Sequence, residues 1–93
     1  MNCKAKGSRA ERRCIAILES AGYVCTKAGG SLGVFDVIAI GPNDVRCVQV
    51  KANEYLSGLE REQIKTLAVP ANVTREYWRF VDGKPREPLI ERL

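Results

Sequence analysis

Apolar residues recur at helical spacing near the start of the chain, which predicts an amphipathic helix there. Ser8 is expected to cap the helix N-terminus, with Glu11 completing a capping box, and Gly22 is expected to end the helix. The apolar stripe consists of Ala10, Cys14, Ile17, Leu18 and Ala21. Residues 1–7, which precede the cap, are expected to form a flexible basic lead-in.

Runs that are dense in β-branched and apolar residues come next, and such runs predict strands. Residues 23–27 form a short alternating stretch, whereas residues 35–40 and 45–51 form two denser runs. The turn-forming residues Gly-Pro-Asn-Asp separate the two runs at positions 41–44. The two runs therefore predict a β-hairpin.

The hairpin register decides which polar side chains meet. With the turn at residues 41–44, Ile40 faces Val45, and Asp36 then faces Gln49, with Lys51 just beyond on the same face. A slip by two residues would place Asp36 opposite Lys51 instead. Either register gathers an acid, an amide and an ammonium group at one end of the hairpin.

The second half of the chain predicts one more helix and up to two strands. Ser57 and Glu60 repeat the capping-box pattern at the helix start, and Pro70 marks its end. Residues 76–81 alternate as a strand, and residues 85–93 supply at most a short edge strand. One face of the helix carries Leu59, Gln63, Ile64, Leu67 and Ala68.

The resulting order, α-β-β-β-α-β with a possible final strand, predicts an α/β fold. An antiparallel hairpin followed by a helix that crosses over to a later strand favours a mixed sheet flanked by helices. A chain of 93 residues with 45% apolar residues has room for a single domain, residues 1–93.

Residue usage excludes several classes of site. The chain has no histidine, which excludes Ser-His-Asp and Cys-His catalysis. Its four cysteines, Cys3, Cys14, Cys25 and Cys47, form no Cys-x-x-Cys pair, so they are expected to be reduced and mostly buried. No apolar run is long enough to span a bilayer or to form a signal peptide, so we expect a cytoplasmic protein with no membrane partner.

The net charge of +4 is unevenly distributed. Residues 1–51 hold eight Lys or Arg and four Asp or Glu, whereas residues 52–93 hold seven of each. A basic patch of this size suits a phosphate backbone, although a soluble surface with loose basic termini is about as common at this charge. The patch near the first helix comprises Lys4, Lys6, Arg9, Arg12 and Arg13.

Asp36 is the sharpest anomaly in the predicted sheet. A carboxylate followed by Val-Ile-Ala-Ile stands where a strand prefers an apolar residue, so it requires a cation nearby. One explanation without a function is a structural ion pair between Asp36 and Lys51. Gln49 on its own is also ordinary, because polar residues are common on solvated sheet faces. The convergence of the three polar groups, beside a glycine-rich loop at residues 28–33, favours a functional site instead.

Two further polar residues have alternative explanations. Glu11 is the capping-box acid of its helix, yet its position borders the apolar stripe and would let it face the sheet. Gln63 is either a boundary amide or a group that points toward the site. The loop glycines around Ser31 allow a loop that grips phosphate, and an ordinary connecting loop is equally compatible.

In order and spacing, these residues resemble the PD-(D/E)XK nuclease superfamily. The greatest resemblance is to archaeal-type Holliday junction resolvases, with the VRR-NUC nucleases as a near relation. It covers residues 7–52 closely and weakens after residue 70. The matching segments are Gly7-Ser8-Arg9-Ala10-Glu11-Arg12, Gly22-Tyr23, Lys27, Gly29-Gly30-Ser31, Phe35-Asp36-Val37-Ile38-Ala39 and Val48-Gln49-Val50-Lys51.

The resemblance implies a role for each matching residue. Asp36 would ligate a divalent metal, with Glu11 and Gln49 assisting, and Lys51 would position or activate the attacking water. Ser31 would lie near the scissile phosphate. The implied cofactor is Mg²⁺, with Mn²⁺ as a substitute, and no nucleotide cofactor is expected. DNA contacts would come from the basic patch together with Lys27 and Ser31.

The chain departs from the pattern of the family at two positions. Gln49 stands where a second acid is usual, and Phe35 replaces the proline that often precedes the first acid. An amide oxygen can ligate magnesium but brings no charge, so metal affinity should be lower. We predict a Mg²⁺-dependent endonuclease of branched DNA that acts as a homodimer. The alternatives are a weakly active or inactive DNA-binding module with this fold and a nuclease of flaps or duplex.

Overall fold

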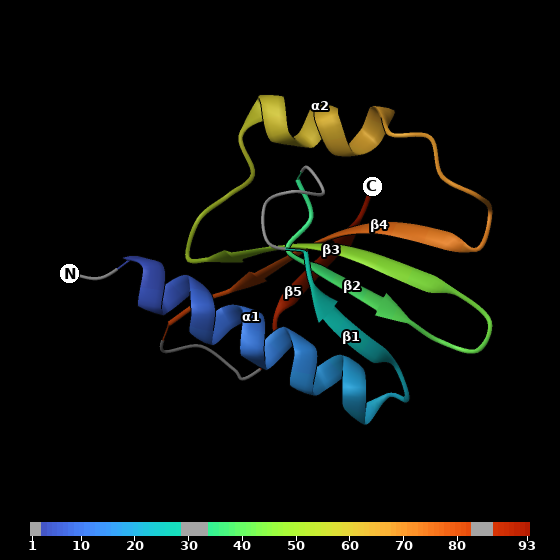
Figure 1. The fold of residues 1–93 in the computed structure, drawn as a ribbon. Helices are drawn as coiled ribbons and strands as arrows, with labels where there is room; N and C mark the ends of the chain where they lie inside the picture. The colour runs from blue at the N-terminus through green and yellow to red at the C-terminus, as the bar shows by residue number, and fades with distance from the viewer. Residues whose placement is uncertain (1–2, 29–33, 83–86) are drawn as a thin grey trace.

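The computed structural model describes residues 3–28, 34–82 and 87–93, and it describes side chains from Arg9 onward. These residues form two helices and a five-stranded sheet (Figure 1). The elements are α1 (Cys3–Ser20), β1 (Val24–Lys27), β2 (Val37–Ile40), β3 (Val45–Ala52), α2 (Gly58–Thr66), β4 (Val73–Phe80) and β5 (Leu89–Arg92). This order confirms the predicted α/β fold, including the final edge strand.

The sheet is mixed, as predicted. Its strands lie in the order β1-β2-β3-β4-β5, and all neighbours are antiparallel except β3 and β4. The parallel pair arises because α2 carries the chain from the end of β3 back to the start of β4. The helix α1 covers one face of the sheet and α2 the other (Figure 1). The sheet, which includes the start of β2 and the end of β3, therefore lies between the two helices.

The β2–β3 register is the one predicted from a turn at residues 41–44. Ile40 pairs with Val45, and Val37 pairs with Val48. Beyond the regular ladder, the Asp36 amide donates to the Val48 carbonyl oxygen at 2.8 Å. The two-residue slip is therefore excluded, and Asp36 lies level with Gln49.

The start of α1 differs from the prediction. The helix begins at Cys3, so Ser8 lies inside it and is not a cap, and residues 3–7 of the expected flexible lead-in are helical. The first turn contains Lys4, Ala5 and Lys6, which favour helix enough to outweigh the cost of Gly7. The end is as predicted, because Gly22 adopts a left-handed conformation with φ of 95°.

The second helix has the predicted start and an earlier end. Ser57 accepts a hydrogen bond from the Glu60 amide at 3.0 Å, and the Glu60 carboxylate accepts one from the Ser57 amide at 3.0 Å. The helix stops at Thr66 because Leu67 is extended, well before Pro70. Arg75 of β4 donates to the Leu67 carbonyl oxygen at 2.6 Å, which satisfies a carbonyl near the helix end.

The two sheet faces have separate apolar cores. The residues under α1 are Ala10, Cys14, Leu18, Val37, Ala39, Val48, Val50, Trp78 and Phe80. Those under α2 are Phe35, Leu56, Ile64 and Tyr77. Leu59 and Leu67, which were expected on the packed face of α2, are 71% and 46% exposed, so Ile64 anchors this short helix.

The described cysteines are free thiols. Cys14 is buried, while Cys25 and Cys47 are half-buried, in agreement with the expectation of reduced side chains. Burial raises the pKa of the Cys14 thiol to about 12, so it remains protonated. Within the described residues, neither helix is long and apolar enough to cross a membrane.

A buried ion pair links β3 to β4 on the α1 side of the sheet. Glu76 has no exposed surface, and both its carboxylate oxygens accept from the Arg46 guanidinium at 2.8 Å. Thr74 and Trp78 also donate to Glu76, at 2.5 and 2.8 Å. Desolvation alone would raise the pKa of Glu76, but these hydrogen bonds outweigh it and lower that pKa. Glu76 is therefore held as a carboxylate.

We expect Glu76→Gln to lower the free energy of unfolding by about 3 kcal/mol, because it leaves the Arg46 charge largely buried without a counterion. Urea denaturation at pH 7 measures this change. The contribution of the wild-type pair is present above the unfolded-state pKa of the carboxyl and is lost as the pH falls through its lower folded-state pKa.

Glu91→Gln is the matched control, since it breaks the exposed Arg61–Glu91 pair and should cost less than about 1 kcal/mol. Equal losses for the two variants would contradict a special role for the buried pair.

Candidate functional site

The polar residues singled out in the hairpin meet where β2 begins and β3 ends. The register places Asp36 level with Gln49, and Lys51 lies two residues further along β3 on the same face. Gln49 is 7% exposed, while Asp36 and Lys51 are half-buried. The predicted acid, amide and ammonium group are therefore gathered at one sheet end.

Asp36 is held in place by β3. Its Oδ2 accepts a hydrogen bond from the Val50 amide at 2.9 Å. The side-chain amide of Gln49, in the orientation that satisfies its hydrogen bonds, donates to the same Oδ2 at 3.1 Å and to the Val34 carbonyl oxygen. Burial raises the pKa of Asp36, and this effect exceeds the lowering by the Val50 amide and by the Lys51 charge. Two donors thus fix the carboxylate, but its negative charge is poorly compensated.

Glu11 of α1 is the second acid of the site. Burial raises its pKa first, and the negative charge of Asp36 raises it further, which indicates that the two carboxylates are close. Lys27 of β1 lies 3.9 Å from Glu11 Oε1 and only partly offsets these effects. The capping-box explanation for Glu11 is wrong, since Ser8 is not a cap. The effect of the Asp36 charge on Glu11 agrees with the alternative expectation that the Glu11 side chain faces the sheet.

Lys51 pairs with Glu60 rather than with Asp36. Its Nζ lies 3.0 Å from Glu60 Oε2, and the two side chains are 19% and 29% exposed. Because Glu60 Oε1 accepts from the Ser57 amide, one carboxylate joins the cap of α2 to the lysine. The sequence shows Glu60 only as a capping-box acid, and no signal in it indicates the contact with Lys51.

The donor set is compatible with a divalent metal ion. Asp36 and Glu11 offer carboxylate oxygens, and Gln49 offers an amide oxygen if its amide rotates; oxygen donors of this kind suit Mg²⁺. Burial raises the pKa of both acids, and the charge of Asp36 raises that of Glu11 further; a cation bound between the two carboxylates would lower both pKa values. In the described part of the chain, no three His, Cys, Asp or Glu side chains form a ready-made cluster. The amide oxygen of Gln49 would therefore be needed to complete the set of metal ligands.

Several predicted residues lie outside this centre or outside the described structure. Ser31, with the rest of residues 29–33, and the side chains of Lys4 and Lys6 fall outside the described residues. Gln63 is exposed on α2, so it is a surface amide and is not part of the site.

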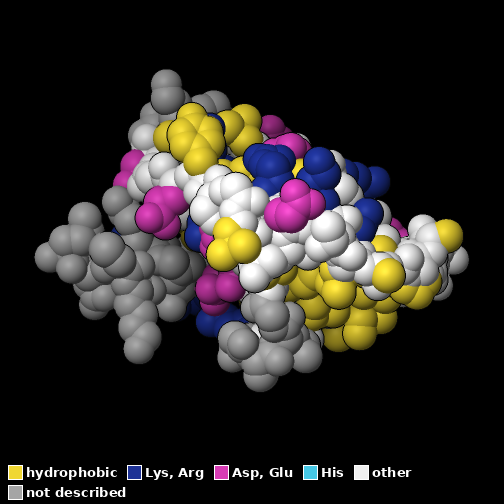
Figure 2. Space-filling view, turned by 90° about the horizontal axis from the view of Figure 1, so that it is seen from above, with side chains coloured by type: hydrophobic (Ala, Val, Ile, Leu, Met, Phe, Trp, Pro, Cys, Tyr) yellow, Lys and Arg dark blue, Asp and Glu magenta, His cyan; other side chains and the backbone are white. Residues whose placement is uncertain are grey.

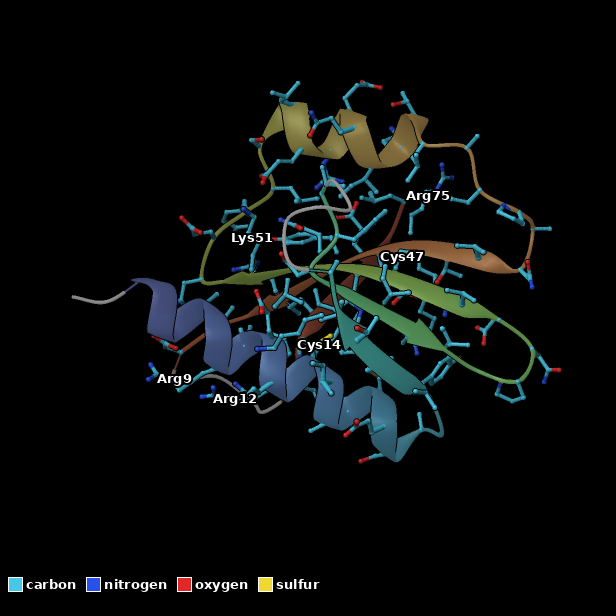
Figure 3. The ribbon with its side chains drawn as sticks, in the orientation of Figure 1. Arg9, Arg12, Cys14, Cys47, Lys51 and Arg75 are labelled. Carbon is cyan, nitrogen blue, oxygen red and sulfur yellow. The ribbon has the colours of Figure 1, made fainter. Side chains whose placement is uncertain are left out.

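The basic residues on and near α1 differ in their surroundings. Arg9 and Arg12 are exposed on the side of the helix turned away from the sheet, whereas Lys51 lies on the opposite side of the sheet, toward α2 (Figure 3). Arg13 packs over the Phe80 ring, with its Cζ 4.8 Å from the ring centroid. Lys27 is 48% exposed next to Glu11. Among these cations, Lys27 pairs with a metal-ligand candidate, Glu11.

Positive charge also gathers on the α2 side of the molecule. Figure 2 shows Lys and Arg side chains grouped over part of this face, with Asp and Glu side chains around them. On this side of the sheet, Arg61 of α2 pairs with Glu91 at 2.6 Å, and Arg75 of β4 donates to carbonyls at the end of α2. The basic surface is therefore not confined to the first half of the chain.

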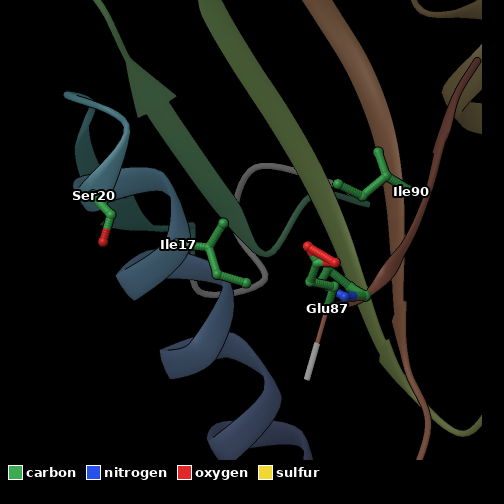
Figure 4. Close-up of a pocket in the computed structure, with 5 residues that line it drawn as sticks. Ile17, Ser20, Glu87 and Ile90 are labelled. Atoms are coloured by element: carbon green, nitrogen blue, oxygen red, sulfur yellow. The ribbon is translucent and has the colours of Figure 1, made fainter. Parts of the chain in front are cut away.

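A separate hollow lies between α1 and the segment that leads into β5 (Figure 4). Its volume is about 430 Å³, and its lining is Ile17, Ser20, Glu87, Pro88 and Ile90. None of the predicted site residues contributes to it. The polar residues predicted to form the site therefore lie at the end of the hairpin, away from this mainly apolar hollow.

Comparisons with known proteins agree with the observed fold. The family model described as archaeal Holliday junction resolvase (Hjc) matches residues 2–81. The solved structure of Hjc from Archaeoglobus fulgidus, titled a Holliday junction resolvase from an archaeal hyperthermophile, is similar in fold, with a TM-score of 0.70 and 25% sequence identity. The match covers 85% of this chain and 67% of that one. No curated protein sequence matches at a significant level.

Proposed function

The chain belongs to the archaeal Holliday junction resolvase family, and we propose that its hairpin site hydrolyses phosphodiester bonds of branched DNA with Mg²⁺ as cofactor. Membership of this family indicates a metal-dependent DNA endonuclease. The identity of the metal, the residue roles and the form of the substrate are our proposals. The assignment agrees with a chain that contains no histidine, because metal-assisted hydrolysis does not require one.

The observation that carries the proposal is the pair of carboxylates at the end of the hairpin. Asp36 and Glu11 come from different elements and are both partly desolvated, and the charge of Asp36 raises the pKa of Glu11. Such an arrangement is unfavourable without a cation and becomes favourable with one. The basic side chain that pairs with Glu11, Lys27, lies 3.9 Å away and is 48% exposed, so it offsets only part of the effect of burial and of the Asp36 charge.

Each residue has a defined task in this proposal. Asp36 and Glu11 hold the ion, and the Gln49 oxygen joins them. When bound, the ion would supply Lewis-acid chemistry, since it would polarise the phosphodiester and lower the pKa of the attacking water. Lys51, oriented by Glu60, stabilises negative charge that develops on the phosphate. Ser31 lies outside the described residues, and its proposed role near the scissile phosphate rests on the family resemblance alone.

The proposed partner is DNA, bound by a homodimer in the cytoplasm. Symmetric cutting of a four-way junction needs two sites, which a dimer supplies. The basic residues on α1 and Lys27 would contact phosphates on either side of the site. Lys4, Lys6, Arg9, Arg12 and Arg13 are the α1 residues in this group.

Cleavage assays test the proposal. The protein is incubated with a labelled four-way junction, a flap, a duplex and a single strand, in Mg²⁺, in Mn²⁺ and in EDTA. Metal-dependent nicking of the junction in preference to the duplex is the expected result. Equal cutting of the duplex would reject branch selectivity, and cleavage in EDTA would reject the metal mechanism.

A second candidate is a DNA-binding module with little or no activity. The observation in its favour is the hydrogen bonding of Gln49, whose amide donates to Asp36 and so partly fills the role of a cation there. Tight, selective binding of the junction with no cleavage in either metal would support this module over the enzyme.

Gln49→Glu tests whether Gln49 belongs to the metal site. Without metal, it replaces a hydrogen bond of 3.1 Å to Asp36 with a repulsive pair of carboxylates, so the melting temperature should fall. Added Mg²⁺ should raise that temperature more than in the wild type and saturate at a severalfold lower concentration, since the added charge strengthens metal binding.

Differential scanning fluorimetry against Mg²⁺ concentration measures this change, and the cleavage assay then reports whether activity rises. Gln63→Glu, on the exposed face of α2, is the control for the added charge. An identical Mg²⁺ response in the Gln49→Glu variant and the wild type would place Gln49 outside the metal site.

A further inference from the structure

The aromatic ring of Tyr55 is unusually exposed. The side chain follows the end of β3 and is 74% exposed, whereas Tyr77 and Trp78 are 5% and 1% exposed. The guanidinium carbon of Arg79 lies 4.2 Å from the centroid of the Tyr55 ring, within the range of a cation–π contact. One side of the ring thus has a cation, and much of the ring remains open to solvent.

This pair is adjacent to the proposed catalytic lysine. Arg79 of β4 is the cross-strand partner of Lys51, so the two side chains leave the sheet on the same face from neighbouring strands. Strands in a sheet are roughly 5 Å apart. Because Arg79 contacts the Tyr55 ring and neighbours Lys51 on the adjacent strand, the ring lies next to the site on its β4 side.

The loop that carries Tyr55 is anchored by the sheet. The Tyr77 hydroxyl donates to the Glu54 carbonyl oxygen at 2.7 Å, which fixes the backbone just before Tyr55. Leu56, the next residue, is buried in the apolar core under α2. An exposed aromatic ring between two anchored residues is positioned in advance, which lowers the entropy that binding would cost.

We propose that Tyr55 and Arg79 form a stacking platform that receives a nucleobase of the bound DNA strand next to the site of cleavage. The inference rests on the proposed function for the nature of the ligand. Bases stack on aromatic side chains without a requirement for sequence, and a guanidinium beside the ring adds attraction to the phosphate backbone. The platform therefore suits a base that is unstacked, as at a branch point, more than a base within a continuous duplex.

The test compares equilibrium binding of a labelled four-way junction with that of a duplex of the same sequence, in EDTA, so that cleavage does not interfere. Tyr55→Ala should weaken junction binding about tenfold, because it removes a stacking surface, and should weaken duplex binding less. Tyr55→Phe and Tyr55→Trp keep the ring and should bind the junction within about twofold of the wild type. A loss in Tyr55→Phe equal to that in Tyr55→Ala would assign the effect to the hydroxyl and overturn stacking.

Ile40→Ala is the control for the loss of an exposed apolar side chain, because Ile40 is 52% exposed at the far end of the hairpin. It should leave binding unchanged. Unchanged junction binding by Tyr55→Ala would overturn the proposal. A change in oligomeric state of Tyr55→Ala in analytical ultracentrifugation would also overturn it, because the ring would then be a protein contact.

The result of the Tyr55→Ala binding test can be told apart from the result of the cleavage assay that tests the proposed function. A protein that never cuts DNA but loses junction binding in Tyr55→Ala supports the platform while rejecting the enzyme. Conversely, metal-dependent cleavage with no effect of Tyr55→Ala on binding supports the enzyme and rejects the platform.

Discussion

Asp36→Ala is expected to lower metal-dependent cleavage of a four-way junction by at least about a thousandfold, the largest effect expected of any substitution in the chain. Asp36 combines a carboxylate, partial burial and a fixed orientation through the Val50 amide. Alanine removes the main ligand of the proposed metal and leaves Glu11 without a partner in the site. Single-turnover cleavage with saturating protein measures the effect, because it separates chemistry from product release.

Binding of the same junction in EDTA should be unchanged or slightly tighter for Asp36→Ala, because a negative charge near the phosphate is lost. Isothermal titration with Mg²⁺ should show the loss of metal binding directly. Glu62→Ala, which removes an exposed carboxylate from α2, is the matched control and should cleave at the wild-type rate. Retained cleavage in Asp36→Ala would show that the site has been assigned to the wrong residue.

Lys51→Ala should lower the single-turnover rate by about a hundredfold to a thousandfold, with little change in junction affinity. The lysine is proposed to act on charge that develops during the reaction, so its loss should affect the rate constant far more than the affinity. Rapid-quench measurements over a range of protein concentrations separate the two quantities. An equal loss of affinity would identify Lys51 as a binding residue instead.

Glu60→Gln tests how the lysine is oriented. The glutamine oxygen can still accept the Ser57 amide, so the cap of α2 should survive, while the ion pair of 3.0 Å to Lys51 is lost. The rate should fall about tenfold, as is usual for a residue that acts through another. In Lys51→Ala, the further change Glu60→Gln should have almost no effect, whereas additive losses would contradict the link between them.

The hairpin and its polar residues could be predicted from the sequence because the information is local. The turn residues 41–44 fix the register, and the register alone brings Asp36 level with Gln49. The start of α2 was predictable for the same reason, since a capping box lies within four consecutive residues. These features depend on neighbours along the chain, and neighbours are what a sequence displays.

Contacts between distant segments were not predictable in this way. Arg46 and Glu76 are 30 positions apart in the sequence and meet because β3 and β4 pair in parallel, whereas the sequence predicts Glu76 only as the first residue of a strand. The contact of Lys51 with Glu60 depends on where α2 lies over the sheet. The sequence predicts the wrong start for α1 for another reason. Ser8 and Glu11 have the spacing of a capping box, but the residues before Ser8 are also helical. A local motif does not exclude that a helix begins before it.

Glu60 links the stability of the first turn of α2 to the orientation of Lys51, two properties that are usually independent. Its two oxygens serve the first turn of α2 and the ammonium group of Lys51, so the folding of that turn and the alignment of the lysine share one side chain. Fraying of the turn would release the lysine before the rest of the domain unfolds. The temperature at which the chemistry fails would then be set by a nine-residue helix rather than by the sheet beneath it.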